Sequence, residues 1–181
     1  MTRQALDDER RHLAQLLEAV QRSAFYLHAT ASKIEWPLRG PVLESRQKDV
    51  DLFESLAAFN ERFAKLQDTL GATMRHAALL MSEPASPFLR VLSLFEKLGV
   101  IDSIEAWQLV RTARNLAAHD YETDYELIAQ HFNELESLRP LLVLAGARLV
   151  DLCATALAVR PSSDAFLAEF EAAIVALGLR R

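Results

Sequence analysis

The sequence predicts an all-α protein, an up-and-down antiparallel helical bundle formed by a single domain over residues 1–181. Leucine and alanine, two residues with high helix propensity, supply 31 and 28 of the 181 residues. Only 5 glycines and 6 prolines are present, which excludes the many tight turns of a β-sandwich. Apolar residues also recur at steps of three and four positions in long runs, the spacing that places them on one face of a helix.

The composition indicates a globular domain with its own core. With 51% hydrophobic and 25% charged residues, the chain is large enough to bury that core without disulfides. Its single cysteine, Cys153, lies in an alanine- and leucine-rich run, so we expect a buried structural thiol in a cytoplasmic protein. The first residues carry no apolar signal segment, and Arg148 and Asp151 interrupt the most apolar stretch, 140–159, so we expect no membrane span.

Proline and glycine separate six predicted helices. Their approximate bounds are 7–34, 47–81, 86–98, 102–119, 123–159 and 164–177. The first is predicted to end before the Trp36-Pro37 pair, because the proline ring removes a backbone donor. The following Arg39-Gly40-Pro41 is predicted to form a loop. The second helix carries an unusually long apolar seam, as expected of the central helix of a bundle.

The starts of several helices are marked by capping residues. Ser86 and Pro87 are of the types preferred at the N-cap and at the first helical position. The segments 102–105 (Asp-Ser-Ile-Glu) and 123–126 (Thr-Asp-Tyr-Glu) have the spacing of a capping box and predict the starts of the next two helices. Long helices joined by short connections favour a bundle of the first, second, fourth and fifth helices. One or two short extra helices are expected beside it, with a C-terminal helical extension over 161–181.

The predicted helix 102–119 carries an arginine on its apolar side. A helical wheel places Arg114 beside Val110 and Trp107, and places Arg111 in the polar arc. A guanidinium on the apolar side must pair with a carboxylate, reach a cleft or face a subunit interface, because an unpaired buried charge costs several kcal/mol. The simplest interpretation is an ion pair with a carboxylate of another helix.

Two further residues extend this feature into a motif, the string Arg114-Asn-Leu-Ala-Ala-His119-Asp-Tyr121. A lone histidine at the end of a helix is usually explained by the helix dipole or by a hydrogen bond to a free carbonyl. Here an asparagine follows the arginine, a tyrosine follows the histidine, and the chain turns at this point. The combination is more specific than any of its members.

The string Arg-Asn-x-x-x-His-x-Tyr resembles the signature of the HEPN superfamily, and in particular of the HepT toxins encoded beside minimal nucleotidyltransferase (MNT) antitoxins. The resemblance extends over about the middle half of the chain, from Phe63 to Leu138. In this region a long predicted helix precedes a short one and then the helix that carries the motif. The resemblance implies a helical homodimer in which two motif helices face each other.

The resemblance also implies a function, that of an endoribonuclease toxin that cleaves RNA without a metal or other cofactor and is neutralised by an MNT antitoxin. Arg114 and His119 would be catalytic, Asn115 and Arg111 would be supporting polar residues, and Tyr121 would be the position to which the MNT partner adds AMP. These residue types suit the chemistry, because the 2′-hydroxyl of RNA is its own nucleophile. The site then needs a base that titrates near neutral pH and a cation for the developing phosphoryl charge.

A second interpretation is a non-catalytic helical module that binds a partner nucleotidyltransferase. It is favoured by four carboxylates directly after the motif, which would repel an approaching polyphosphate: Asp120, Glu122, Asp124 and Glu126. Acidic residues are equally expected in the first turn of the next helix. The net charge of −5 argues against broad capture of nucleic acid, and DNA is not an expected partner. No pair of histidines has the spacing of a metal site, so no metal is expected.

Overall fold

The computed structural model of the chain describes residues 3–116 and 124–179. Within these ranges the protein is all-helical, with seven helices and no strand, which confirms the predicted fold class. The helices are α1 (Arg3–Ala31), α2 (Gly40–Ser45), α3 (Val50–Leu80), α4 (Phe88–Lys97), α5 (Ile104–Leu116), α6 (Tyr125–Ala156) and α7 (Leu167–Ala176).

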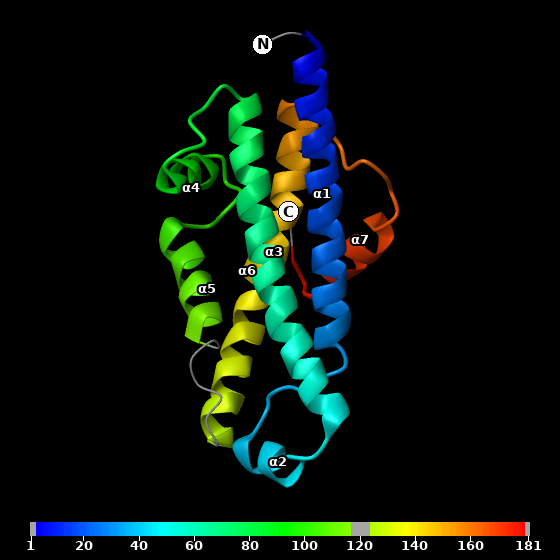
Figure 1. The fold of residues 1–181 in the computed structure, drawn as a ribbon, viewed down its shortest axis with the longest axis vertical. Helices are drawn as coiled ribbons and strands as arrows, with labels where there is room; N and C mark the ends of the chain where they lie inside the picture. Colours follow the sequence, from blue (N-terminus) through cyan, green and yellow to red (C-terminus); the bar gives the residue numbers. More distant parts are fainter. Residues whose placement is uncertain (1–2, 117–123, 180–181) are drawn as a thin grey trace.

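Four of these helices form an up-and-down bundle (Figure 1). In the view shown, α1 descends, α3 ascends, α5 descends and α6 ascends again. They are the first, second, fourth and fifth of the helices expected from the sequence. Helix α4 lies beside the upper half of α3, α2 lies at the lower end of the bundle, and α7 packs on the outer side of α1.

The core follows the predicted apolar stripes. Leu13, Leu17 and Val20 of α1 are completely buried, as are Phe59 and Phe63 of α3. Each such side chain contributes about 1.5–3 kcal/mol when it leaves water. The three long helices α1, α3 and α6 therefore form a frame whose position is set by close packing, and the shorter helices attach to this frame.

Three capped helix starts lie one residue later than the sequence predicts. Helix α4 begins at Phe88, so its N-cap is Pro87 and not Ser86, and no side chain caps it. The α5 cap is Ser103, whose Oγ accepts from the backbone N–H of Ala106 at 3.0 Å, because the carboxylate of Asp102 instead pairs with Arg148 of α6. The α6 cap is Asp124, whose Oδ1 accepts from the backbone N–H groups of the second and third residues after it. The expected cap Thr123 lies outside the described residues.

Helix α2 corrects the expectation of a loop at Arg39-Gly40-Pro41. The helix begins at Gly40, and Pro41 occupies its first turn, where a missing N–H costs nothing. A β-carbon on Gly40 would lie 2.9 Å from both the Cα and the backbone nitrogen of Glu126, so a glycine is required for α2 to approach α6 this closely. A six-residue helix is too short to show a periodic pattern, which is why the sequence did not reveal it.

The C-terminal extension packs onto the bundle through aromatic side chains. Phe166 lies against Phe25 and Tyr26 of α1, with ring centroids 6.0 and 6.3 Å apart, and Phe170 of α7 is fully buried. The extension thus contributes to the same hydrophobic core as the four long helices. In the part of the chain that the structure describes, no helix has the length and apolar character needed to cross a membrane.

The close approach of α2 to α6 gives the first testable prediction. We expect Gly40→Ala to lower the free energy of unfolding by about 1–3 kcal/mol, because the new methyl group forces the two backbones apart. Gly71→Ala in α3 is the matched control, since its β-carbon would lie 3.4 Å from the ring of Phe88, an ordinary contact. Exchanging that helical glycine for alanine should be neutral or stabilise by up to about 1 kcal/mol. Urea unfolding followed by circular dichroism measures both, and equal effects would contradict the prediction.

Candidate functional site

Arg114 lies in the last turn of α5 and faces α3. Its Nη1 donates to Oδ1 of Asp68 at 2.6 Å and to the backbone carbonyl of Ala64 at 3.2 Å. The arginine side chain is 21% exposed and that of Asp68 is 63% exposed, so the pair lies at the surface between the two helices. An exposed pair of this kind contributes only about 0–1 kcal/mol to stability. Of the three arrangements expected for this arginine, the structure shows the pair with a carboxylate of another helix.

Among the described residues, the Arg114 guanidinium is bound through one of its three nitrogens. Both contacts use Nη1, and neither Nε nor Nη2 bonds to any residue of 3–116 or 124–179. The Nε–Nη2 edge is the one with which arginine binds carboxylates and phosphates through two parallel hydrogen bonds. The arrangement can therefore hold an oxyanion while Asp68 and Ala64 keep the side chain in place.

Gln67 adds a third contact between the same two helices. Its Nε2 donates to the carbonyl oxygen of Trp107 at 3.2 Å, two turns before Arg114 in α5. The side-chain oxygen of Gln67 is buried and has no hydrogen-bond partner among the described residues. Together with Ala64 and Asp68, Gln67 sets the register of α5 along α3 and thereby the place of Arg114.

The predicted wheel of α5 is only partly correct. Val110 and Trp107 are buried as expected. Leu109 lies on the apolar arc of the same helical wheel, but it is 50% exposed. The reason is that α5 packs against α3 and α6 through a narrow stripe, which leaves the neighbouring positions in solvent. Arg111 is exposed on this outer side and forms no hydrogen bond or ion pair with the described part of the chain.

The remaining predicted site residues cannot be compared with Arg114. Asn115 follows it in the backbone of α5, whereas His119 and Tyr121 lie outside the described residues. The structure thus brings together Arg114 and Asp68, and the second of these was missed by sequence reasoning. Asp68 is 46 positions away in another helix, and no local pattern distinguishes it from the other surface carboxylates.

The acidic residues after the motif contribute to the start of α6. Asp124 is the N-cap, and Glu126 lies in the first turn against Gly40 of α2. A shallow hollow at this end of the bundle is also lined by Glu44 of α2. The helix-capping explanation of Asp124 is confirmed, and the carboxylates give this end of the bundle a negative surface.

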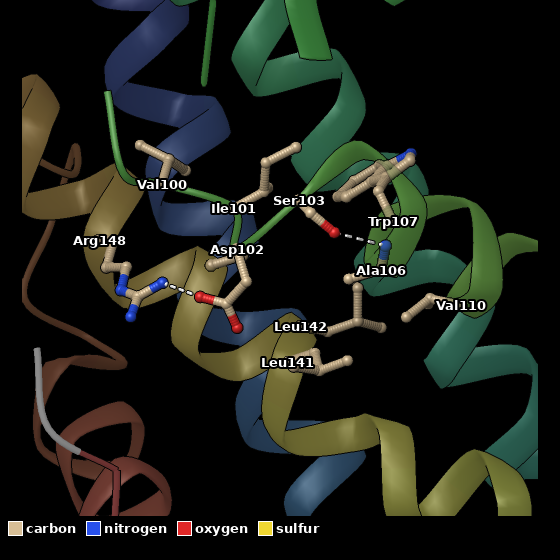
Figure 2. Close-up of a pocket in the computed structure, with 11 residues that line it drawn as sticks. Val100, Ile101, Asp102, Ser103, Ala106, Trp107, Val110, Leu141, Leu142 and Arg148 are labelled. Atoms are coloured by element: carbon tan, nitrogen blue, oxygen red, sulfur yellow. Dashed lines mark hydrogen bonds and ion pairs between the residues drawn. The ribbon is translucent and has the colours of Figure 1, made fainter. Parts of the chain in front are cut away.

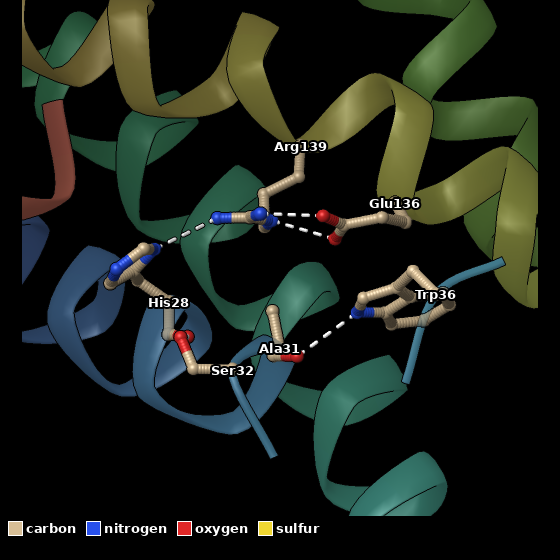
Figure 3. A network of polar contacts seen from close by, with 6 residues as sticks. All are labelled: His28, Ala31, Ser32, Trp36, Glu136 and Arg139. Atoms are coloured by element: carbon tan, nitrogen blue, oxygen red, sulfur yellow. Dashed lines mark hydrogen bonds and ion pairs between the residues drawn. The ribbon is translucent and has the colours of Figure 1, made fainter. Parts of the chain in front are cut away.

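A second polar cluster, not foreseen from the sequence, joins the end of α1 to the middle of α6 (Figure 3). Arg139 is only 6% exposed; its Nε and Nη2 donate to the two carboxylate oxygens of Glu136 at 2.7 and 2.5 Å, and its Nη1 lies 3.0 Å from Nδ1 of His28. Because arginine can only donate, the His28 Nδ1 must accept and the ring is neutral. Burial, followed by the charge of Arg139, lowers the pKa of His28. All three guanidinium nitrogens of Arg139 are thus in contact with Glu136 or His28, and the network joins α1 to α6.

A small pocket lies between the α4–α5 connection, α5 and α6 (Figure 2). Its walls are apolar and include Trp107, Val110 and Leu142, and the ion pair between Asp102 and Arg148, 2.6 Å long, lies at its edge. The volume of about 20 Å³ has room for one water molecule. The pocket is therefore a packing defect beside an ion pair and does not fit a substrate.

Other reactive side chains have structural surroundings. Cys153 is completely buried, and burial raises the pKa of its thiol to about 12, so the thiol stays protonated as expected of a structural cysteine. The rings of His12 and His76 meet edge to face at 4.7 Å, and Nε2 of His76 lies 3.1 Å from a carboxylate oxygen of Glu9. Among the described residues, no group of three or more histidine, cysteine, aspartate or glutamate side chains is arranged to hold a metal ion.

Comparisons with known proteins do not extend these observations. The chain matches no protein-family model, no curated protein and no solved structure. The candidate site consequently depends on the motif at the end of α5 and on the contacts of Arg114.

The buried network predicts how stability depends on pH. Folding lowers the pKa of His28 below its ordinary value of 6.5, so the unfolded chain binds the proton more readily. We therefore expect the free energy of unfolding to fall as the pH is lowered through and below 6.5. In His28→Asn the amide oxygen can still accept from Arg139 but does not titrate, so the decline from pH 7 to pH 5 should be smaller. The half-buried His131, whose pKa burial also lowers, accounts for part of the remainder.

Urea unfolding of both proteins at several pH values measures this difference. Identical pH profiles for the unmodified protein and His28→Asn would contradict the assignment of a neutral His28 with a lowered pKa.

Proposed function

We propose that the protein is a HepT-like HEPN endoribonuclease toxin that cleaves RNA without a metal ion and is neutralised by an MNT-type nucleotidyltransferase. The observation that carries the proposal is the string Arg114-Asn-Leu-Ala-Ala-His119-Asp-Tyr121, which begins in the last turn of the bundle helix α5. The all-helical bundle supports it, because the implied architecture is of the same class.

The proposed reaction is an internal transfer at phosphorus. His119 takes the proton of a ribose 2′-hydroxyl, whose oxygen attacks the adjacent phosphorus while the bond from phosphorus to the 5′-oxygen breaks. The products are a 2′,3′-cyclic phosphate and a 5′-hydroxyl, the latter protonated by water or by the second histidine of a homodimer. Arg114 stabilises the negative charge that develops on the phosphoryl oxygens.

The surroundings of Arg114 support the part assigned to it. The guanidinium is partly exposed, anchored through Nη1 by Asp68 and Ala64, and open along its Nε–Nη2 edge to the described surface. Arg139 forms a useful contrast, because its buried guanidinium is enclosed by Glu136 and His28. Of these two arginines, Arg114 is the one that can receive a phosphate.

The alternative function is a non-catalytic module that binds a partner nucleotidyltransferase in the cytoplasm. One observation favours it: the pair with Asp68 already explains why an arginine is tolerated on the inner side of α5. The negative surface formed by Glu44, Asp124 and Glu126 would suit a basic partner. The two functions differ in whether RNA is cleaved.

Cleavage of RNA by the purified protein in the presence of a metal chelator tests the proposal. We expect cyclic-phosphate ends on the products, no cleavage of DNA, and a loss of at least about 100-fold in His119→Ala, because general base catalysis contributes about 10²–10⁴. Arg114→Ala should lose activity to a similar degree. Activity that depends on added metal, or that persists in His119→Ala, would contradict the mechanism.

Arg148→Ala is the matched control for Arg114→Ala. Both arginines lie on bundle helices, and each donates through Nη1 to an aspartate at 2.6 Å. Both substitutions remove one partly exposed ion pair between distant parts of the chain and should lower stability by about 0–1 kcal/mol. If the two variants lost cleavage equally, the loss would come from the fold and not from the proposed site.

Modification of Tyr121 distinguishes toxin from binding module in cells. Expressed alone, the chain should slow bacterial growth; co-expression with the nucleotidyltransferase encoded beside it should restore growth and add the mass of AMP to a peptide that contains Tyr121. The added phosphate would block approach of RNA by bulk and by like charge. Tyr121→Phe lacks the acceptor hydroxyl and should remain toxic in the presence of that enzyme. A harmless chain that binds the enzyme tightly and carries no AMP would support the module instead.

A further inference from the structure

The contact between Asp68 and Arg114 is more than the pairing of two surface charges. The two acceptors of Nη1, the Asp68 carboxylate and the Ala64 carbonyl, are four residues apart and lie on the same face of α3. They fix the same nitrogen from two sides. Nε and Nη2 form no hydrogen bond with the described residues.

An arginine fixed in this way has a defined Nε–Nη2 edge, which none of the described residues occupies. The guanidinium is planar, so two bonds to Nη1 restrict both the position and the tilt of the Nε–Nη2 edge. Holding a catalytic or binding group in its productive orientation before the ligand arrives lowers the entropy lost at the moment of reaction. A carboxylate that formed only a weak surface pair with Arg114 could still have a large effect on function through this orientation.

We propose that Asp68 is a positioning residue, which holds Arg114 by Nη1 so that its Nε–Nη2 edge is presented to a phosphodiester of RNA. The inference rests on the proposed ribonuclease function and adds to it a residue outside the motif, from the neighbouring helix. Asp68 touches Arg114 and not the reacting atoms, so its removal should affect the rate of the chemical step more than the binding of RNA.

The kinetic test compares Asp68→Ala with Asp68→Glu and with Asp102→Ala. We expect Asp68→Ala to lower kcat by at least tenfold, since a displacement of about 1 Å can cost about 100-fold. Its KM should not rise, because the substitution removes a negative charge from the surface that RNA approaches. Asp68→Glu retains a carboxylate and should recover most of kcat. Asp102→Ala removes the equivalent pair with Arg148 and should leave kcat within twofold of the unmodified protein.

A second measurement does not depend on cleavage. Nitrogen-15 relaxation of the arginine side chains reports how rigidly each Nε–H group is held. The Arg114 signal should be ordered in the unmodified protein and in Asp102→Ala, and mobile in Asp68→Ala. Titration with an RNA whose 2′-hydroxyls are methylated, and which therefore cannot be cleaved, should shift the Arg114 Nε–H signal.

The outcomes separate the two proposals. If RNA is cleaved but Asp68→Ala retains kcat within twofold, or if Asp102→Ala loses as much, the positioning role is wrong and the ribonuclease stands. If the unmodified protein cleaves no RNA, while Arg114 loses order in Asp68→Ala and its signal responds to methylated RNA, the ribonuclease is wrong and the positioning of a phosphate-binding arginine stands. An Arg114 that is equally mobile with and without Asp68 overturns the inference in either case.

Discussion

The packing of α3 in the centre of the bundle is the constraint on which the rest of the structure depends. Helices α1, α4, α5 and α6 all contact it, and its apolar seam supplies some of the largest fully buried side chains, including Phe59 and Phe63. Because interiors are packed as densely as organic crystals, each neighbour of α3 has little freedom to slide or rotate. The position of α5, and therefore of Arg114, follows from this packing and from the polar contacts of Gln67 and Asp68.

Arginines in this fold show how surroundings decide what one residue type does. Arg139 is enclosed by a carboxylate and a neutral histidine, and its charge is used to join α1 to α6. Arg148 pairs with Asp102 beside a pocket of about 20 Å³ and ties the start of α5 to α6. Arg114 and Arg148 each donate through Nη1 to one aspartate, and neither has a partner at Nε or Nη2 among the residues that the structure describes. Arg114 differs from Arg148 in belonging to the motif, and under the proposed function this makes Arg114 the arginine that contacts a phosphate.

The charge distribution limits how an RNA would be recognised. The net charge of −5 and the carboxylates at the start of α6 argue against an affinity for RNA that comes from the release of many counterions. Under the proposed function, recognition depends on a single well-oriented cation in each chain and on the second copy contributed by a homodimer. In such a site the rate of cleavage depends more on the orientation of Arg114 than on the total charge, so a residue that positions Arg114 should have a large effect on activity.

The all-helical class and the four bundle helices could be predicted from the sequence alone, because they follow from helix propensity and from a period of 3.6 residues. The same period predicts the apolar stripes that bury residues such as Leu17 and Phe63. The sequence also placed the helix caps to within one residue, since a cap depends only on its immediate neighbours. The tertiary structure alone decided that α2 exists, that Arg139 is buried against His28, and that Arg114 is anchored by Asp68. Each of these depends on which groups from distant parts of the chain meet after the helices have packed, and no local pattern carries that information.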